Sequence, residues 1–211
     1  MTNTLDPSLL RLTELELDAL TELVNVGVSR AAASLAVMCN EAVSLSVPAV
    51  STVTPEQAAE MIGGDHGRKV VAIEQGYSGE VEGRALLIFP EASSLELVRA
   101  VAGESASAEE LVELAPEALL ETGNVVLQAC LGTLSNMLQR KVDIGTPKLV
   151  EGPAQELFPR VSREGVLFIY INFALRGRRV RGYIALLMDL VALNALKQVV
   201  REFVERETGA G

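Results

Sequence analysis

The stretch DALTELVN at residues 18–25 recurs as EALLETGN at residues 117–124. Three polar residues of this stretch, at positions 18, 22 and 25, and a later proline at position 48 each recur 99 positions further along the chain, at 117, 121, 124 and 147. The matching pairs are Asp18 and Glu117, Glu22 and Glu121, Asn25 and Asn124, and Pro48 and Pro147. Solenoid repeats have periods of about 20 to 50 residues, so this longer repeat indicates a duplicated half-domain with pseudo-twofold symmetry.

The order of predicted elements repeats as well. In the first half, Thr13 and Glu16 form a capping box that opens a helix to about residue 40. A strand over residues 42–53 follows, and its Pro48 is expected at a sheet edge or a strand irregularity. Next come a short helix over residues 55–62 and a hairpin whose strands, 69–74 and 82–89, are joined by a turn at 76–79. A helix from Pro90 to about residue 101 ends the first half. The second half predicts a helix over 116–140, a strand over 142–150, a loop with Pro153 and Pro159, a hairpin of 165–173 and 180–188, and a last helix to about residue 206.

We therefore expect an α/β (α+β) fold in which the two half-domains share one sheet. We expect the whole chain, residues 1–211, to form a single domain with repeats over 12–102 and 111–206 and a linker near 103–107, where Gly, Ser and Ala cluster. Each half alone would leave one face of its helix and sheet exposed. The two long helices that carry the motif are expected on the surface.

The composition of the chain indicates its cellular compartment and the class of partner that it binds. The chain has 49% hydrophobic and 22% charged residues, and its net charge of -10 disfavours nucleic acid and anionic membranes while favouring a partner with a basic contact surface. Cys39 and Cys130 lie in apolar helical stretches, which predicts reduced core thiols and a cytoplasmic protein. The apolar tracts 166–175 and 183–200 are too short or contain Asp189 and Asn194, so no membrane span is expected.

The motif residues occupy the polar faces of the two long helices. At about 100° per residue, Glu22 and Asn25 lie opposite the apolar stripe of the first helix, and Glu121 and Asn124 lie opposite that of the second. A solvated face explains a glutamate, but an asparagine costs roughly half a kcal/mol relative to alanine inside an exposed helix. Its recurrence beside the same glutamate indicates function, because a carboxylate next to a carboxamide can pair with a cation and orient a water molecule for hydrolysis.

This doubled pattern resembles the signature of the CheC/CheX/FliY phosphatases of bacterial chemotaxis. Asp18, Glu22, Asn25 and Pro48 match it, and the second copy departs from it only at Glu117. Two copies in a chain of this length resemble CheC, since CheX carries one motif and FliY adds a carboxy-terminal flagellar-switch domain. The segment GEVEGRALLIFP at residues 79–90 is also similar to the family's hairpin after the first motif.

The resemblance implies hydrolysis of the phosphoaspartate of a CheY-like receiver domain. By matching position, Asn25 and Asn124 orient the attacking water, and Glu22 and Glu121 form salt bridges to the receiver's lysine. The phosphorylated receiver supplies the Mg²⁺, so the resemblance implies no cofactor or metal site in this chain, and the deamidase CheD is a further candidate partner. The rival interpretation is a non-catalytic adaptor that binds a receiver or a flagellar component through the same faces, as the related fold of FliM binds without hydrolysing.

The two sites are expected to be unequal. Gly123 precedes Asn124 at the buried position where the family usually has glycine, whereas Val24 precedes Asn25. Glycine lets a helix approach its neighbour closely, and a valine there has to be accommodated by moving the helix or repacking its surroundings. We therefore expect the second site to be dominant.

Overall fold

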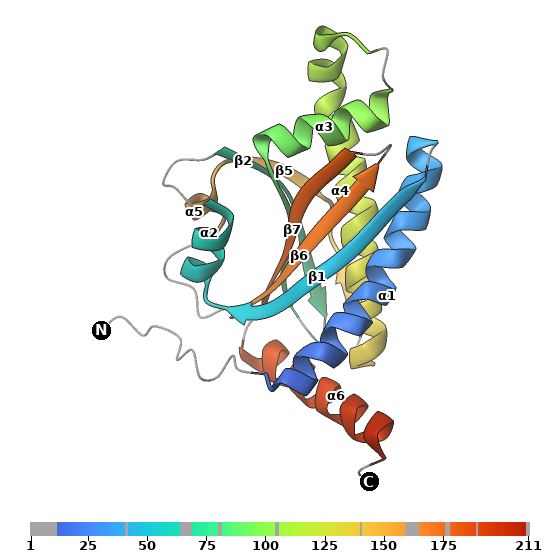
Figure 1. Cartoon of the computed structure of the whole chain (residues 1–211). Helices are drawn as coiled ribbons and strands as arrows, with labels where there is room; N and C mark the ends of the chain where they lie inside the picture. The colour runs from blue at the N-terminus through green and yellow to red at the C-terminus, as the bar shows by residue number, and fades with distance from the viewer. Residues whose placement is uncertain are drawn as a thin grey trace, which may run out of the picture.

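The computed structural model describes residues 12–40, 42–63, 69–79, 82–103, 106–139, 141–158, 165–175, 178–188 and 190–209. Within these residues, one antiparallel sheet of seven strands is flanked by six helices (Figure 1). The expected mixed α/β architecture with a single shared sheet is confirmed.

The sheet interleaves the two halves of the chain. Its strands are β1 (Val43–Val53), β2 (Lys69–Gly79), β3 (Gly83–Pro90), β4 (Val142–Ile144), β5 (Lys148–Pro153), β6 (Gly165–Leu175) and β7 (Arg178–Met188). They are ordered β1-β6-β7-β3-β2-β4, with β5 also pairing with β2. Each motif strand thus pairs with the hairpin of the other half, β1 with β6 and β4 and β5 with β2, while β3 and β7 join the halves at the centre.

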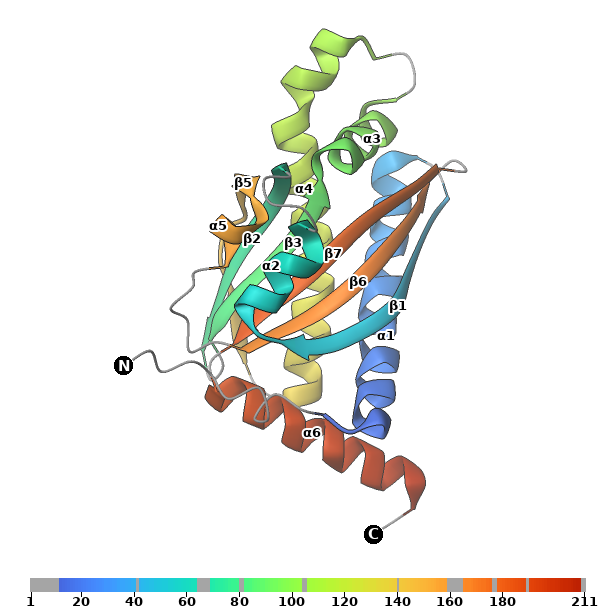
Figure 2. The same ribbon diagram turned by 60° about the vertical axis from the view of Figure 1, so that its left-hand side comes forward.

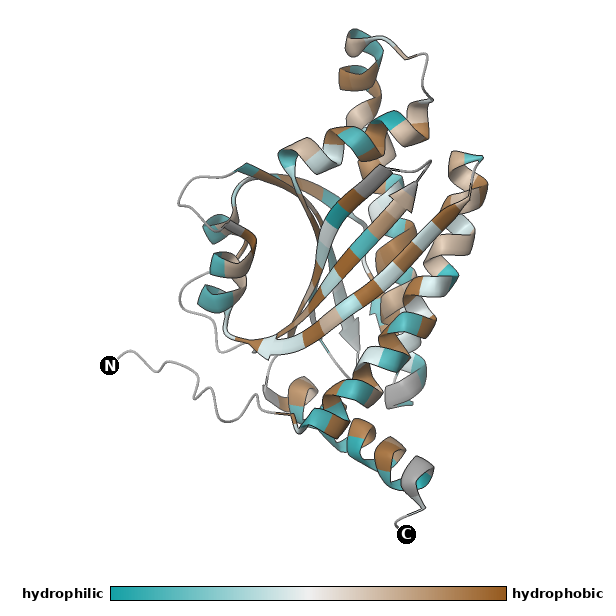
Figure 3. Cartoon of the chain, viewed as in Figure 1, coloured by the Kyte–Doolittle hydropathy of each residue, from teal (hydrophilic) through white to brown (hydrophobic). Residues whose placement is uncertain are grey.

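Two long helices cover one face of the sheet. They are α1 (Glu14–Cys39) and α4 (Ala108–Leu138), which run in opposite directions side by side (Figures 1 and 2). Inward side chains of the strands pack beneath them, and this alternation of hydrophobic and hydrophilic residues is visible along β1 in Figure 3. The two helices are close together at Gly27 of α1, where an added methyl group would lie 2.8 Å from Thr133 Oγ1 of α4.

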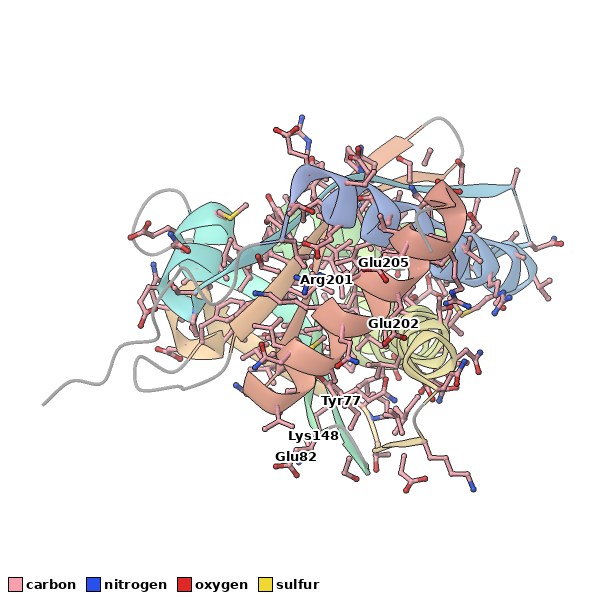
Figure 4. All side chains as sticks on the ribbon, turned by 90° about the horizontal axis from the view of Figure 1, so that it is seen from below. Tyr77, Glu82, Lys148, Arg201, Glu202 and Glu205 are labelled. Atoms are coloured by element: carbon pink, nitrogen blue, oxygen red, sulfur yellow. The ribbon has the colours of Figure 1, made fainter. Side chains whose placement is uncertain are left out.

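The four shorter helices close the ends and the other face. On the opposite face, α2 (Pro55–Gly63) and α5 (Ala154–Leu157) cover a second, smaller core (Figure 2). At the two ends lie α3 (Glu91–Ala102) and α6 (Leu190–Thr208), and Figure 4 shows α6 crossing the lower end, with Arg201, Glu202 and Glu205 along it. The apolar tracts 166–175 and 183–200 are β6 and the succession of β7 and α6.

Matching caps frame the two long helices. Capping boxes open both, formed by Thr13 and Glu16 in α1 and by Ser107 and Glu110 in α4. Both end at a residue in the left-handed region, Asn40 and Gln139, each with φ 50°. Among the described helices, α1 alone reaches the length and apolar content of a membrane span, a property that core helices of soluble proteins share.

Three predicted boundaries were wrong. The helix α4 begins at Ala108, two turns before Pro116, because Ser107 supplies the cap and the helix tolerates the exposed proline within it. The predicted strand 142–150 is two strands, β4 and β5, separated by residues 145–147.

The first hairpin turns after Gly79 rather than at 76–79. The chain stays extended there because Tyr77 is buried, its hydroxyl donates to the Leu187 carbonyl at 3.1 Å, and residues 77–79 pair with β4. Pro159 and the tip of the second hairpin at 176–177 lie outside the described residues.

Both cysteines are free and buried, as predicted. Burial raises the pKa of the Cys130 thiol to about 12. A thiol held protonated in this way is inert near neutral pH.

Candidate functional site

The polar faces of α1 and α4 carry the motif residues in the predicted arrangement. Asp18 and Glu22 on α1 are exposed, as are Glu117 and Glu121 on α4. The opposite sides of both helices are buried against the sheet, through residues that include Leu20, Val28, Ala31 and Leu35 in α1 and Leu119, Val126, Leu127 and Cys130 in α4.

The asparagines differ from the prediction that they face solvent. Asn25 and Asn124 are half-buried, and in each the carboxamide oxygen accepts a hydrogen bond from the protein. Asn25 contacts the outer strand β1, and Asn124 contacts the inner strand β2. A half-buried amide held by fixed donors has less rotamer freedom than one on an open helix face, which suits a group that works by positioning.

In the first site, the main chain of β1 holds the asparagine. The backbone N–H of Val47 donates to Asn25 Oδ1 at 3.2 Å. It is free to do so because the pairing of β1 with β6 shifts register between Ser46 and Ala49, a β-bulge that contains Pro48. Proline has no N–H to give to the sheet, so it belongs at such an irregularity of an edge strand. The bulge that contains Pro48 is therefore also the place where β1 contacts Asn25.

In the second site, two glutamines hold the asparagine. Asn124 Oδ1 accepts from Gln128 Nε2 at 2.8 Å and from Gln75 Nε2 at 3.2 Å. The same Gln75 nitrogen donates to the Gly145 carbonyl at 3.0 Å, just before Pro147. The break between β4 and β5 at residues 145–147 thus corresponds to the bulge in β1. Here, however, the side chain of Gln75 makes the contact with the asparagine, in place of a main-chain N–H.

Gln75 was missed by the sequence analysis. It lies on β2 and is 1% exposed, on the inward face shared by Val71, Ile73 and Tyr77. A glutamine at an inward position of an otherwise apolar alternating strand is the signal that could have identified it, since buried polar side chains need partners.

The two glutamates are free to meet an external cation. Within the described part of the chain, no ion pair or hydrogen bond engages Glu22 or Glu121. The described residues also contain no group of three or more His, Cys, Asp or Glu side chains arranged to hold a metal ion.

The residues that precede the two asparagines, Gly123 and Val24, pack differently, as the sequence implies. A methyl group on Gly123 would lie 2.4 Å from Ile73 Cγ2, so α4 rests directly on β2. Val24 is half-buried and lines a cavity of about 10 Å³ with Leu167 and Ile169. The valine is accommodated above β6, where the packing is less close than that under Gly123.

No family model matches the chain, whereas several solved structures share its architecture. FliY from Thermotoga maritima matches with a TM-score of 0.71 at 18% identity, over 90% of this chain and 98% of that one. The FliM middle domain from H. pylori matches at 0.59 and 12% identity, over 89% and 99%. CheX from Desulfovibrio desulfuricans matches at 0.51 and 15% identity, over 78% and 99%. The chain has the fold of the CheC/CheX/FliY family, which the doubled motif had indicated.

Proposed function

We propose that this protein is a phosphatase that hydrolyses the phosphoaspartate of a CheY-like receiver domain and so terminates a chemotaxis signal in the cytoplasm. The observation that carries the proposal is the repeated pair on the two long helices. In each, donors of the sheet or helix hold the oxygen of an asparagine amide, and an exposed glutamate with no partner among the described residues lies one turn away.

The proposed reaction is an in-line displacement at phosphorus. The oxygen of a water molecule bonds to phosphorus while the bond from phosphorus to the aspartyl oxygen breaks. The aspartate leaves as a carboxylate, and the water's proton passes to the released phosphate. Phosphoryl transfer depends mainly on positioning and electrostatics, so one added amide can accelerate it without a covalent intermediate.

The roles divide between this chain and its substrate. Asn25 and Asn124 fix the water, and Glu22 and Glu121 bind the receiver's lysine. Asp18, Pro48, Glu117 and Pro147 support the motif. The receiver brings the Mg²⁺ and the phosphoryl group. The net charge of -10 supports such a partner, because a cationic contact surface is drawn to an acidic one.

The test is the decay rate of a phosphorylated receiver. CheY charged with acetyl phosphate and freed of excess donor is incubated with catalytic amounts of the protein, and inorganic phosphate is followed over time. We expect accelerated release by the wild type and spontaneous decay with the double variant Asn25→Ala and Asn124→Ala. Unaccelerated decay across a panel of receivers would contradict the proposal.

The second candidate is a non-catalytic adaptor for a receiver or a flagellar-switch component. The likeness to the FliM middle domain favours it, because that likeness spans 89% of this chain. Binding to a receiver separates the two functions when it is measured beside hydrolysis. An adaptor binds the phosphorylated and the spontaneously hydrolysed receiver without turnover, whereas a phosphatase releases the receiver after each cycle. CheD is a further candidate ligand for the same binding assay.

A further inference from the structure

We propose that Gln75 is the positioning residue of the second site, and that it holds the Asn124 carboxamide with its NH₂ group directed outward. This inference rests on the proposed phosphatase function and extends it to a residue outside the motif. It also states which end of the Asn124 amide faces the substrate, namely the NH₂ donors and not the carbonyl oxygen.

The hydrogen-bond network fixes the orientation of both amides. The Gly145 carbonyl can only accept, so the Gln75 atom 3.0 Å from it is the nitrogen. That nitrogen is a donor, so the Asn124 atom 3.2 Å from it is the oxygen. Gln128 Nε2, at 2.8 Å, approaches the same Asn124 oxygen. With Oδ1 occupied by two donors, Nδ2 is left as the group that Asn124 presents.

Holding Asn124 in this orientation leaves one polar atom of Gln75 without a hydrogen bond. Its Oε1 is buried and has no hydrogen-bond partner among the described residues. Buried carbonyl oxygens in this condition are rare in native proteins and call for an explanation. The two bonds made by Nε2, to Gly145 and Asn124, provide one, because turning the amide to satisfy Oε1 would set that oxygen against the Gly145 carbonyl.

The first site shows that Gln75 is a feature of one half only. On β6, Ile171 lies between Asn172, which pairs with Ser46, and Tyr170, which pairs with Ala49. It therefore faces the Val47 and Pro48 bulge as Gln75 faces the interruption at 145–147. There a main-chain N–H holds Asn25 Oδ1, and the position across the bulge is apolar.

Both sites reach the same polarity by different means. In the first, Val47 N–H is a donor, so the Asn25 atom that faces it is the oxygen as well. Each asparagine therefore offers N–H donors to the oxygen of the attacking water or of the phosphoryl group. In the second site, this orientation of the amide depends on the side chain of Gln75, which can be replaced by mutation.

The experiment is done in an Asn25→Ala background, so that only the second site reports. Gln75→Ile gives β2 the residue found at the equivalent position of β6, and Gln75→Glu keeps the length but replaces the donor with an acceptor. We expect kcat for receiver dephosphorylation to fall at least tenfold in both variants, with KM within about twofold. Ile171→Val, at the matching buried position beside the disabled first site, is the control and should leave kcat unchanged.

A second readout is independent of activity. Hydrogen exchange of the side-chain amides, followed by NMR, should show slow exchange for Gln75 NH₂ and fast exchange for Asn124 NH₂. In Gln75→Glu the ionised carboxylate should draw the Asn124 NH₂ inward and slow its exchange, and protonation at low pH should reverse this.

Unchanged kcat in both Gln75 variants, or fast-exchanging Gln75 protons in the wild type, would overturn the positioning role. If the wild type hydrolyses the receiver but the Asn25→Ala protein does not, the second site contributes no activity and the positioning role is overturned. If the wild type itself shows no hydrolysis, the proposed function fails instead, and the exchange data alone decide how Gln75 orients Asn124. Gln75→Met, which preserves the buried volume, replaces Gln75→Ile if that variant does not fold.

Discussion

Asn25 and Asn124 carry the same proposed chemistry on supports of unequal quality. Asn124 stands on a helix seated directly on Ile73 and has two donors on its oxygen, whereas Asn25 has one donor and a valine beneath its helix. A displacement near 1 Å costs about a hundredfold in a mechanism that works by positioning. We therefore predict that Asn124→Ala removes most of the activity on a phosphorylated receiver and Asn25→Ala a minority. Equal losses, or the reverse order, would show that the valine before Asn25 does not weaken the first site.

Gly123 is predicted to be the most sensitive position of the second site outside its polar residues. In Gly123→Ala the new methyl group would meet Ile73 at 2.4 Å, so α4 or β2 has to move. Overpacking of this kind costs about 1–3 kcal/mol. Urea denaturation should show that loss, and activity in the Asn25→Ala background should fall as well. Gly132→Ala is the control, because it lies on the same helix with open space around it.

At the scale of the helices, the exposed glutamates give a charge-dependent prediction. Glu22→Gln combined with Glu121→Gln should weaken engagement of the receiver with little effect on folding, since exposed substitutions usually stay within about 0.5 kcal/mol. Raised salt should reproduce part of the loss in the wild type and have less effect on the double variant. The measurement is receiver affinity against ionic strength, with thermal unfolding beside it. A large loss of thermal stability would mean that these residues are structural.

The start of α1 is tied to α6 by a buried carboxylate. Glu16 accepts from the Thr13 N–H at 2.7 Å and from Arg201 Nε at 3.1 Å. Burial opposes its ionisation, but the bonds from Thr13 and the nearby Arg201 guanidinium outweigh this and hold the pKa of Glu16 below its ordinary value of 4.5. A lowered pKa in the folded state means that the ionised carboxylate adds stability above pH 4.5, and that this stability is lost as the pH falls through the lowered pKa.

We therefore predict that Glu16→Gln destabilises the protein by about 0.5–1 kcal/mol at pH 7, the range of a helix-terminus charge and a partly exposed ion pair. The difference from the wild type should shrink as the pH is lowered below 4.5. Denaturant unfolding at several pH values measures it. Glu14→Gln, an exposed change on the same helical turn, should show a smaller effect. A difference that persists in acid would assign the effect to packing.

The sequence was sufficient for most elements because their signals are local. The capping box at Thr13 and the apolar stripe of α1 define that helix without help from the rest of the chain. Pro116 was misleading because a proline is accepted at the first turn of a helix, and the stronger start signal at Ser107 lay in a segment assigned to the linker. The extension of β2 to Gly79 depends on pairing with β4, a contact between residues more than sixty positions apart.

At the scale of the whole molecule, the interleaved sheet makes the two halves dependent on each other. Neither half can complete its motif strand pairing alone, because β1 lies on β6 and β5 on β2. We predict a single cooperative unfolding transition, with coincident curves from far-UV circular dichroism and from tyrosine fluorescence. Two separate transitions, or a stable fragment covering residues 12–102, would contradict this prediction.

This interleaving also explains what the sequence could not reveal about the site. The repeat identified Glu22, Asn25, Glu121 and Asn124, but their supports come from strands that meet the helices only in three dimensions. Gln75 belongs to the first half and serves Asn124 in the second, 49 positions away. A search for residues conserved between the two copies passes over it, since its counterpart is Ile171.

The bulge at Pro48 and the break at Pro147 have a consequence for solubility. They lie in β1 and beside β4 and β5, the outermost strands of the sheet. An outer strand with a full row of free N–H and C=O groups is a template for joining another chain edge to edge, and a proline or a bulge spoils that template. The bulge at Pro48 and the break at Pro147 therefore protect the edges of the sheet as well as lying beside the two asparagines, so replacing these prolines to alter activity carries a risk of aggregation.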